Sequence, residues 1–408
     1  MRKTTTSIVA ALLVGALPGP HASAQSSIWP SENGRIAFRS NADGEPDVFS
    51  MEATGGGSTN LTGRSGISDA QPAWSPDGGR IAFVRRNRAG GRPDLFVMTA
   101  AGRGRQRLTR TPVTERDPAW SPSGTRIAFA ARTSTRGPFR IFVAGADGSG
   151  VVQLTAQGRG TADRSPAWSP DDTRIAFVSD RDGGFPSLYV MNADGTGVKR
   201  LTTTAFVSGN PSWSPDGTRI AVERCCVNGT SDIVAIDVAT GVETSLTDTT
   251  SFQEFDPAWS PDGTRIAFVA FQVGEGNVDL WVMNADGTGV TRLTSAPAVE
   301  LSPHWQPLPV CTIRGTSGAD LLTGTDGPDV ICGLGGHDTL SGGAGDDLIL
   351  AGRGNDSAAG ESGDDLILGQ GGDDSLDGGP GYDVIDGGPG TDSCFPGADG
   401  AFMRLCEA

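Results

Sequence analysis

The chain has 408 residues and a net charge of −16, and 37% of its residues are hydrophobic. This length is sufficient for a large core and a second folded unit. After the first residues no stretch is apolar enough to span a bilayer, so the sequence predicts no transmembrane segment. The acidic charge is local, because residues 311–408 hold 16 Asp and 2 Glu against 3 Arg.

The first residues have the order of a secretory signal peptide. Arg2 and Lys3 precede a short apolar run at residues 8–17, and small residues follow at 22–24. We therefore expect residues 1–24 to be a signal peptide and the mature chain to be secreted or held in the cell envelope. A membrane anchor is the alternative, but the apolar run is too short to cross a bilayer.

One motif organises residues 34–306. Its clearest copy is Trp-Ser-Pro-Asp-Gly-Thr-Arg-Ile-Ala-Phe at residues 259–268. Related copies begin or end at five other tryptophans: Trp74, Trp120, Trp168, Trp213 and Trp305. Successive tryptophans are 45 to 48 residues apart, and this period indicates stacked copies of one supersecondary unit.

Each unit is predicted to be a four-stranded blade of a β-propeller. In one copy, strands at 211–214 and 219–222 flank a Pro-Asp-Gly-Thr turn, where proline presets φ and glycine permits a positive φ. Strands at 233–237 and 243–246 complete that blade.

The two ends of the repeat array are out of phase. The first unit starts at Gly34 without a first strand, and the last unit stops at Trp305 after one strand. The C-terminal strand can therefore complete the N-terminal blade. This closure predicts a ring of six blades without open sheet edges.

These motifs resemble the TolB-type (WD40-like) propeller repeat. The resemblance is carried by Ser-Pro-Asp-Gly-Thr-Arg-Ile-Ala-Phe at 260–268 and by segments such as Leu-Tyr-Val-Met-Asn-Ala-Asp-Gly at 188–195. It covers residues 34–306 and implies a six-bladed β-propeller that makes protein contacts in the cell envelope.

Six polar residues occupy one register at the start of the predicted innermost strands. They would surround one mouth of the central channel: Gln71, Asp117, Ser165, Asn210, Asp256 and Ser302. A polar pocket is the functional interpretation, and ordinary polarity at strand starts is the structural one.

The residues argue against Ser-His-Asp catalysis. After the predicted signal peptide the chain has only His304 and His337, and it has no Gly-x-Ser-x-Gly turn. His304 directly precedes Trp305, where other repeats have Ala or Ser, so a packing or channel-lining role is the simpler interpretation.

Arginine is concentrated in one part of the repeat array. Residues 80–140 contain 14 Arg against Asp94, Glu115 and Asp117. The candidates for an anionic surface or polymer site are Arg85, Arg86, Arg88, Arg92, Arg103, Arg105, Arg107 and Arg110. A solvated face is the simpler alternative. Nucleic acid is not expected as a partner, because no aromatic residues alternate with this charge and the chain is expected to be exported.

The C-terminal segment, residues 311–408, contains a nonapeptide repeat. An aspartate recurs every nine residues: Asp320, Asp329, Asp338, Asp347, Asp356, Asp365, Asp374, Asp383 and Asp392. A glycine lies two places before each aspartate, and an apolar residue lies two places after it in most copies. The pattern resembles the RTX (haemolysin-type) repeat and implies a parallel β-roll that binds Ca²⁺.

The spacing agrees with calcium chemistry. Ca²⁺ takes six to eight oxygen ligands, which a glycine-rich turn with carbonyls and a carboxylate can supply. Two nonapeptides make one coil, so the aspartates form two columns of five and four, with room for at most seven ions between neighbours. A disordered Gly/Asp linker is the alternative, and we expect the segment to fold only with calcium.

Six cysteines remain to be placed. In an exported protein Cys311–Cys332 and Cys394–Cys406 are plausible disulfides at the two ends of the roll, and the other pairings stay open. The adjacent Cys225 and Cys226 form either a vicinal disulfide or free thiols.

The sequence thus predicts an all-β chain with a six-bladed β-propeller followed by a parallel β-roll of nonapeptide repeats. The expected function is an exported, non-enzymatic calcium-binding protein whose propeller contacts a protein or an anionic cell-surface polymer. The alternative is an extracellular hydrolase or lyase that acts on polysaccharide through the propeller channel.

Overall fold

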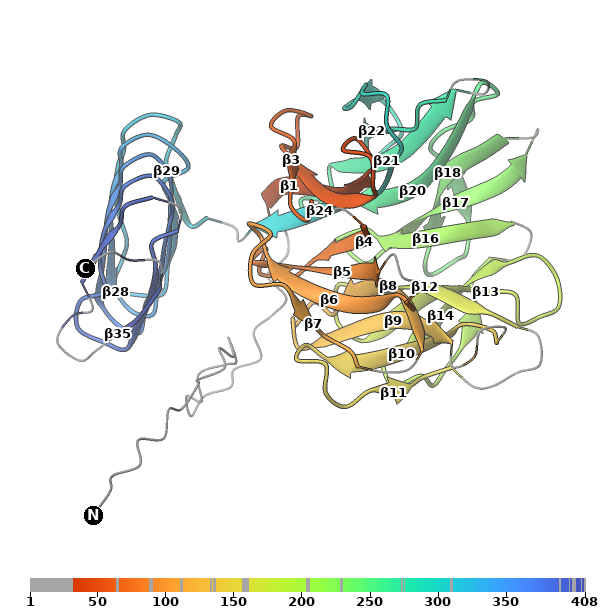
Figure 1. Cartoon of the computed structure of the whole chain (residues 1–408), viewed down its shortest axis with the longest axis horizontal. Helices are drawn as coiled ribbons and strands as arrows, with labels where there is room; N and C mark the ends of the chain where they lie inside the picture. The colour runs from red at the N-terminus through yellow and green to blue at the C-terminus, as the bar shows by residue number, and fades with distance from the viewer. Residues whose placement is uncertain are drawn as a thin grey trace, which may run out of the picture.

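The computed structural model describes residues 32–406, apart from 64–65, 88–90, 111–112, 133, 135–136, 156–160, 203–205, 228–229, 273, 275, 309–310, 389, 396, 398–400 and 405. The expected signal peptide, residues 1–24, lies outside the described residues. Over the described part every regular element is a β-strand, and no helix there is of a length and apolarity to cross a membrane. The predicted all-β architecture of a propeller and a roll is confirmed (Figure 1).

Six four-stranded antiparallel sheets form the blades of the propeller. The first blade consists of β24 (Glu300–Leu308), β1 (Glu32–Ser40), β2 (Asp47–Met51) and β3 (Thr59–Asn60). The next two consist of β4 (Ile67–Trp74), β5 (Arg80–Asn87), β6 (Asp94–Thr99) and β7 (Gln106–Arg107), and of β8 (Thr114–Trp120), β9 (Arg126–Arg132), β10 (Arg140–Gly145) and β11 (Val152–Gln153).

The other three blades follow in chain order. The fourth blade consists of β12 (Asp163–Trp168), β13 (Arg174–Ser179), β14 (Ser187–Asn192) and β15 (Lys199–Arg200). The fifth consists of β16 (Val207–Trp213), β17 (Arg219–Val227), β18 (Thr230–Asp237) and β19 (Glu243–Ser245). The sixth consists of β20 (Phe252–Trp259), β21 (Arg265–Gln272), β22 (Asp279–Asn284) and β23 (Thr291–Arg292).

The repeated Ser-Pro-Asp-Gly-Thr-Arg motif forms the turn between the first two strands of a blade. In the fifth blade, Ser214 Oγ donates to Asp216 Oδ1 at 2.5 Å and accepts from the Arg219 N–H at 2.9 Å. Gly217 takes φ = 69°, which glycine adopts without steric cost. The serine hydroxyl thus joins both arms of the turn, which explains why the motif recurs as a unit.

The tryptophans pack between neighbouring blades, as expected. The indole Nε1–H of Trp213 donates to the Ala167 carbonyl of the preceding blade at 3.1 Å. The guanidinium carbon of Arg174, also in that blade, lies 4.9 Å from the centre of the Trp213 ring. The same stack joins Arg80 to Trp120 at 4.7 Å, so the arginine that ends the turn motif contributes to the contact between blades.

The ring closes as the out-of-phase ends predict. Strand β24 pairs with β1, and Trp305 lies opposite Ile36 in the ladder. Gln306 stands where the other blades have the turn serine. Its side chain donates to the Gly78 carbonyl at 2.8 Å and accepts from the Arg35 N–H at 3.0 Å. The C-terminal strand therefore contacts both the first and the second blade.

The roll consists of two parallel sheets. One has the order β25 (Ile313–Arg314), β27 (Val330–Cys332), β29 (Leu348–Arg353), β31 (Leu366–Gly371), β33 (Asp383–Asp386) and β35 (Ala401–Arg404). The other has the order β26 (Leu321–Thr323), β28 (Thr339–Ala344), β30 (Ser357–Ser362), β32 (Ser375–Asp377) and β34 (Ser393–Phe395).

A single row of apolar side chains from each sheet makes the thin core of the roll. These residues are at most 3% exposed: Ile331, Leu340, Ile349, Ala358, Ile367, Leu376 and Ile385. Disulfides join Cys311 to Cys332 and Cys394 to Cys406. Cys225 is also disulfide-bonded, so a free thiol at this position is excluded.

Three turns of the roll carry a side chain where the repeat favours glycine. The second position of the nonapeptide takes a positive φ, for example 103° at Gly343. Leu334, Glu361 and Gln370 occupy this position with φ of 73°, 68° and 71°. A residue with a Cβ pays about 1–2 kcal/mol in this region.

We expect Gln370→Gly to stabilise the folded roll by about 1 kcal/mol, because glycine removes the left-handed strain and loses only part of that gain to backbone entropy. Calorimetric unfolding measures the change. Gln370→Ala removes the same side chain but keeps the Cβ, so it should give no such gain. Equal effects of the two substitutions would contradict the strain argument.

Candidate functional site

The repeat aspartates of the roll form two hydrogen-bonded columns. From Asp338 onward, each Oδ1 accepts the backbone N–H of the aspartate one coil earlier. Asp338 N–H donates to Asp356 Oδ1 at 2.8 Å, and Asp356 N–H donates to Asp374 Oδ1 at 2.9 Å. The other column has the same arrangement, with Asp329 N–H to Asp347 Oδ1 at 2.8 Å. The carboxylates therefore lie one above another along each side of the roll.

The second carboxylate oxygen distinguishes the central coils from the first ones. At Asp320 and Asp329, Oδ2 accepts from the backbone N–H and the hydroxyl of Thr316 and Thr325 at 2.6–2.9 Å. In five central aspartates the Oδ2 atom is buried without a hydrogen-bond partner: Asp338, Asp347, Asp356, Asp365 and Asp374. These side chains are only 2–3% exposed, so each buried oxygen lacks compensation from the residues that the structure describes.

Main-chain carbonyls converge on the same places. A Cβ built on Gly342 would lie 2.4 Å from Asp347 Oδ2 and 2.5 Å from the Gly360 carbonyl oxygen. A Cβ on Gly360 would lie 2.3 Å from Asp365 Oδ2 and 2.6 Å from the Gly378 carbonyl oxygen. Glycine is needed there because oxygens of two coils already crowd that face.

This oxygen set fits a calcium ion. Hard carboxylate and carbonyl oxygens are the ligands that Ca²⁺ prefers. In the described part of the chain no group of three or more His, Cys, Asp or Glu side chains is placed to hold a metal ion by itself, so main-chain carbonyls would have to supply much of any coordination shell. Burial, followed by the neighbouring aspartates, raises the pKa of Asp365 and of Asp374 to about 6, which shows the cost of these charges without a cation.

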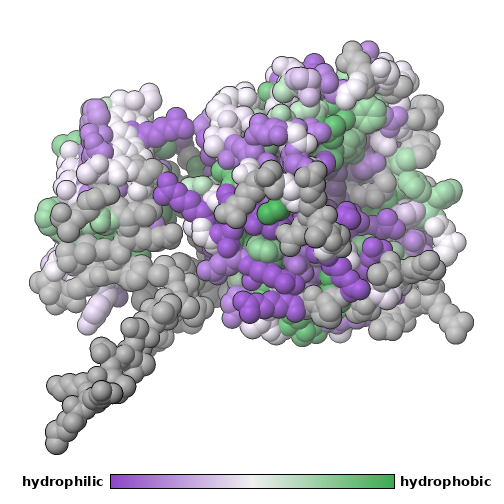
Figure 2. Space-filling view, viewed as in Figure 1, coloured by the Kyte–Doolittle hydropathy of each residue, from purple (hydrophilic) through white to green (hydrophobic). Residues whose placement is uncertain are grey.

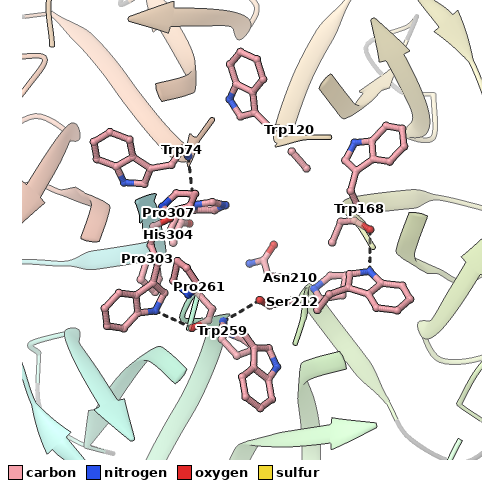
Figure 3. Close-up of a pocket in the computed structure, with 18 of the residues that line it drawn as sticks. Trp74, Trp120, Trp168, Asn210, Ser212, Trp259, Pro261, Pro303, His304 and Pro307 are labelled. Carbon is pink, nitrogen blue, oxygen red and sulfur yellow. Dashed lines mark hydrogen bonds between the residues drawn. The ribbon is translucent and has the colours of Figure 1, made fainter. Parts of the chain in front are cut away.

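The six polar residues at the channel mouth adopt one unusual backbone conformation. All have φ between 44° and 54°: Gln71, Asp117, Ser165, Asn210, Asp256 and Ser302. The ladder between the first two strands of a blade is irregular at this place, as between Arg116 and Ala119 in β8. The six residues, the inner tryptophans and the adjacent prolines line a channel cavity of about 260 Å³ (Figure 3).

The ring residues are joined into two arcs of three blades. In one arc Asp117 accepts from the Gln71 side-chain amide, and from the Ser165 N–H at 3.1 Å. In the other, Asp256 accepts from the Asn210 side-chain amide, and from the Ser302 N–H at 3.0 Å. The order amide, aspartate, serine thus occurs twice around the channel, with each aspartate held by both neighbours.

Comparison with protein families places both parts of the chain. The model of the TolB beta propeller domain matches residues 70–254 and 210–309, which is more than half of the chain. The chain belongs to the TolB β-propeller family. The RTX calcium-binding nonapeptide repeat matches overlapping stretches between residues 314 and 400. The chain therefore joins a TolB-type propeller to RTX calcium-binding repeats.

Individual relatives support the propeller only. The Tol-Pal system protein TolB of Anaeromyxobacter dehalogenans strain 2CP-C is 63% identical over 38 residues, which are 9% of either chain. The chain thus matches a small part of the length of such curated relatives. The crystal structure of TolB from Acinetobacter baumannii superposes with a TM-score of 0.58 at 27% identity over 67% of both chains. The structure of a putative TolB from Agrobacterium tumefaciens superposes with a TM-score of 0.52 at 19% identity, over 67% of this chain and 99% of that one. This second similarity is one of fold.

His304 has a structural role in the TolB-type propeller. Its Nδ1 lies 3.3 Å from the backbone nitrogen of Trp74 and 3.1 Å from the Trp305 carbonyl oxygen, and it accepts from the Trp74 N–H in the tautomer that carries the ring proton on Nε2 (Figure 3). Ser212 does the same in another blade, where its Oγ accepts from the Trp259 N–H at 2.9 Å. Burial lowers the pKa of His304 to about 4, so the ring is neutral at physiological pH.

The two ring aspartates differ in their charged neighbours. Arg116 Nε lies 3.1 Å from both carboxylate oxygens of Asp117. The residue before Asp256 is Phe255, which supplies no charge. Burial, to which the Asp117 carboxylate adds, raises the pKa of Asp256. The polar ring is therefore electrically asymmetric although its hydrogen bonds repeat.

The arginine-rich part has less free charge than its composition implies. Arg85 is buried and forms a bidentate pair with Asp69 at 2.7 and 2.8 Å. Arg107 pairs with Asp94 at 2.8 Å, and Arg105 donates to the Leu61 carbonyl. Arg86, Arg92, Arg103 and Arg110 are exposed, and Arg88 lies outside the described residues. Figure 2 shows hydrophilic side chains gathered over β6 and β7.

One repeated residue of structural importance was missed by the sequence analysis. A Leu-Thr pair ends every blade. The threonine Oγ1 accepts a hydrogen bond from a backbone N–H near the start of the third strand of the same blade. In the fourth blade, the Leu188 N–H donates to Thr202 Oγ1 at 3.1 Å. The same bond occurs in all six blades at 2.9–3.3 Å. Recurrence of Leu-Thr at the blade period is the sequence signal that reveals it.

The low pKa of His304 predicts an acid-sensitive propeller. Between the unfolded pKa of about 6.5 and the folded pKa of about 4, the unfolded chain binds a proton that the folded chain does not. Stability should therefore fall as the pH is lowered through this window, by on the order of 2 kcal/mol for this residue. Urea unfolding followed by tryptophan fluorescence at pH 7.5 and pH 4.5 measures the loss.

His304→Ser provides the control, because serine already accepts the equivalent bond at position 212. The variant should match the wild-type stability at pH 7.5 and lose less of it at pH 4.5. An identical pH dependence in both proteins would exclude His304 as the titrating group.

Proposed function

We propose that the chain is an exported calcium-binding protein whose roll uses Ca²⁺ as a structural ion and whose propeller is an interaction platform. The observation that carries the first part is the set of buried Oδ2 atoms without a hydrogen-bond partner, aligned in two columns. A divalent cation between successive carboxylates would compensate each of them. Export is supported by the signal-peptide pattern at residues 1–24 and by the disulfides of the roll.

The proposed ligands are the nine repeat aspartates with turn carbonyls: Asp320, Asp329, Asp338, Asp347, Asp356, Asp365, Asp374, Asp383 and Asp392. Asp320 and Asp329 are the weakest candidates, because Thr316 and Thr325 already donate to their Oδ2 atoms. The strongest sites should therefore lie in the central coils. The later coils have no threonine at this position of the repeat. Their aspartate Oδ2 atoms lie beside main-chain carbonyl oxygens instead.

Calcium would offset the charge that opposes folding of the roll. The segment 311–408 has 18 acidic and 3 basic residues, and its repeat aspartates are buried. At about 1 mM Ca²⁺ and a dissociation constant near 0.1 mM, each site contributes roughly 1.4 kcal/mol to the folded state. Several sites together are sufficient to make folding of the roll dependent on extracellular calcium.

For the propeller we propose binding to a protein or an anionic surface polymer. The channel mouth has a cavity with polar groups at one register, and exposed arginines lie on the second blade. A hydrolase or lyase needs a carboxylate free to exchange protons with its substrate. Asp117 and Asp256 each accept hydrogen bonds from two neighbouring blades, an arrangement that favours ring stability over acid–base chemistry.

Substitution of one column aspartate tests the calcium sites. Asp374→Asn removes a charge from between Asp356 and Asp392, so up to two sites should be weakened by about tenfold each or lost. Isothermal calorimetry of the full chain with CaCl₂ gives the number and affinity of sites, and circular dichroism follows the gain of β-structure.

Asp373→Asn is the matched control. Asp373 is the exposed neighbour of Asp374, and its Oδ1 accepts from the Thr391 N–H at 2.9 Å, which an asparagine oxygen can also do. The control should bind calcium as the wild type does. Equal losses in both variants would mean that net charge, and not the column, attracts calcium.

A further inference from the structure

A pair of buried carboxylates lies where the fifth and sixth blades of the propeller meet. Asp232, in β18 of the fifth blade, is 1% exposed, and Glu254, in β20 of the sixth, is 4% exposed. Strands β18 and β20 lie side by side at this contact (Figure 1). One residue joins the two groups, because Thr249 donates its backbone N–H to Asp232 Oδ1 at 3.2 Å and its hydroxyl to Glu254 Oε1 at 3.2 Å. Two like charges are therefore held close together inside the propeller.

The corresponding aspartate of two other blades is paired with an arginine. In the sixth blade, Arg292 directly precedes the Leu-Thr pair and donates to the Thr294 carbonyl at 2.8 Å and to Asp279 Oδ2 at 2.5 Å. In the second blade, Arg107 makes the same contact with Asp94 Oδ1 at 2.8 Å. Each arginine thus places a positive charge beside the acidic group at the contact between its blade and the next.

The fifth blade has a serine at the position of this arginine. Ser245 directly precedes the Leu-Thr pair of its blade and lies opposite Val234 in the strand ladder. Arg292 has the same register, opposite Trp281. The serine hydroxyl keeps the bond to the threonine carbonyl, since Ser245 Oγ donates to the Thr247 carbonyl at 2.7 Å. Serine therefore replaces the arginine in its local contact but supplies no charge.

The acids at this blade contact are left without a positive partner. Within the described residues neither Asp232 nor Glu254 forms an ion pair. Arg224, whose charge acts on Asp232, pairs with Glu243 at 3.8 Å instead. Glu254 Oε2 is buried without a hydrogen-bond partner among these residues, whereas the equivalent Oε2 of Glu300 accepts from a threonine hydroxyl. Burial raises the pKa of Asp232 and the pKa of Glu254, which reflects the cost of holding both charges there.

We propose that a calcium ion binds between Asp232 and Glu254 and supplies the charge that an arginine supplies in two other blades. The ligands available are hard oxygens, namely the two carboxylates and the hydroxyl of Thr249, and water can complete the irregular shell of six to eight oxygens that Ca²⁺ accepts. This set contains neither imidazole nor thiolate, so it does not select zinc or copper. Asp248 is exposed and acts on Asp232, so it adds negative charge on the solvent side of the site. The site is separate from those proposed for the roll.

A shared proton is the alternative occupant, because two close carboxylates in a buried place can retain one proton between them. A cation is favoured by the comparison between blades. The guanidinium groups of Arg107 and Arg292 show that the framework accommodates a positive group at this position. The fifth blade keeps the acids and lacks the arginine, which leaves the same place for an ion from solution.

Urea unfolding of the full chain, followed by tryptophan emission in EDTA and in increasing CaCl₂, tests the proposal. All eight tryptophans precede residue 311, so their emission reports the propeller. The wild type should unfold at a higher urea concentration when calcium is present. Glu254→Gln keeps the shape of the side chain and removes its charge, so the calcium dissociation constant obtained from this shift should rise at least about tenfold.

Ser245→Arg restores the arginine of the second and sixth blades. It should raise the unfolding midpoint in EDTA and abolish the response of the midpoint to calcium. Ser245→Ala is the matched control, because it removes the hydroxyl without adding a charge, and it should respond to calcium as the wild type does.

A wild-type midpoint that is the same in EDTA and in calcium overturns this inference and assigns the carboxylate pair to a shared proton. The proposed function of the roll would stand in that case, since calorimetry counts its calcium sites separately. A calcium response that persists unchanged in both Glu254→Gln and Ser245→Arg would place the ion elsewhere and overturn the inference as well.

Discussion

The roll depends on a single constraint, the burial of aspartate columns in turns that bring few donors to them. From Asp338 onward, one oxygen of each repeat carboxylate accepts a backbone N–H of the preceding coil, as in the Asp338–Asp356 bond of 2.8 Å. The other is buried beside main-chain carbonyls, which are themselves acceptors. An arrangement of acceptors facing acceptors is unfavourable until a cation is placed among them. The strands and the thin apolar core therefore provide the frame, and the proposed ion would supply the missing interaction.

The propeller satisfies many of its buried polar groups with its own side chains, although the indole N–H groups of Trp74, Trp168 and Trp259 are buried without a partner among the described residues. The turn serine satisfies an N–H and a carboxylate, and the Leu-Thr threonine satisfies the backbone of the third strand. Tryptophan and arginine then join one blade to the next. Each of these contacts is local or spans one repeat, so the framework of the propeller is built from contacts between neighbouring repeats.

The sequence allowed the architecture to be predicted because its signals are local and periodic. Tryptophans at the blade period and aspartates every nine residues determine how the strands repeat, and the out-of-phase ends determine how the ring closes. The conformation of the ring residues was not predictable, since positive φ at Gln71 or Ser165 has no side-chain signature. Their hydrogen bonds join residues 46 to 48 positions apart and depend on the curvature of the closed ring. Pairing of Arg85 with Asp69 was likewise hidden, because it requires the register of two strands.

The two parts are also separable in their energetics. Among the described residues an ion pair joins them, from Arg353 to Glu52 at 2.9 Å, with side chains that are 78% and 40% exposed. Exposed pairs of this kind contribute little to stability, so folding of the roll should have little effect on the propeller. All eight tryptophans precede residue 311, whereas Tyr382 lies in the roll. A calcium-driven change in circular dichroism without a change in tryptophan emission would therefore reflect a roll that folds as an independent unit beside a propeller that is already formed.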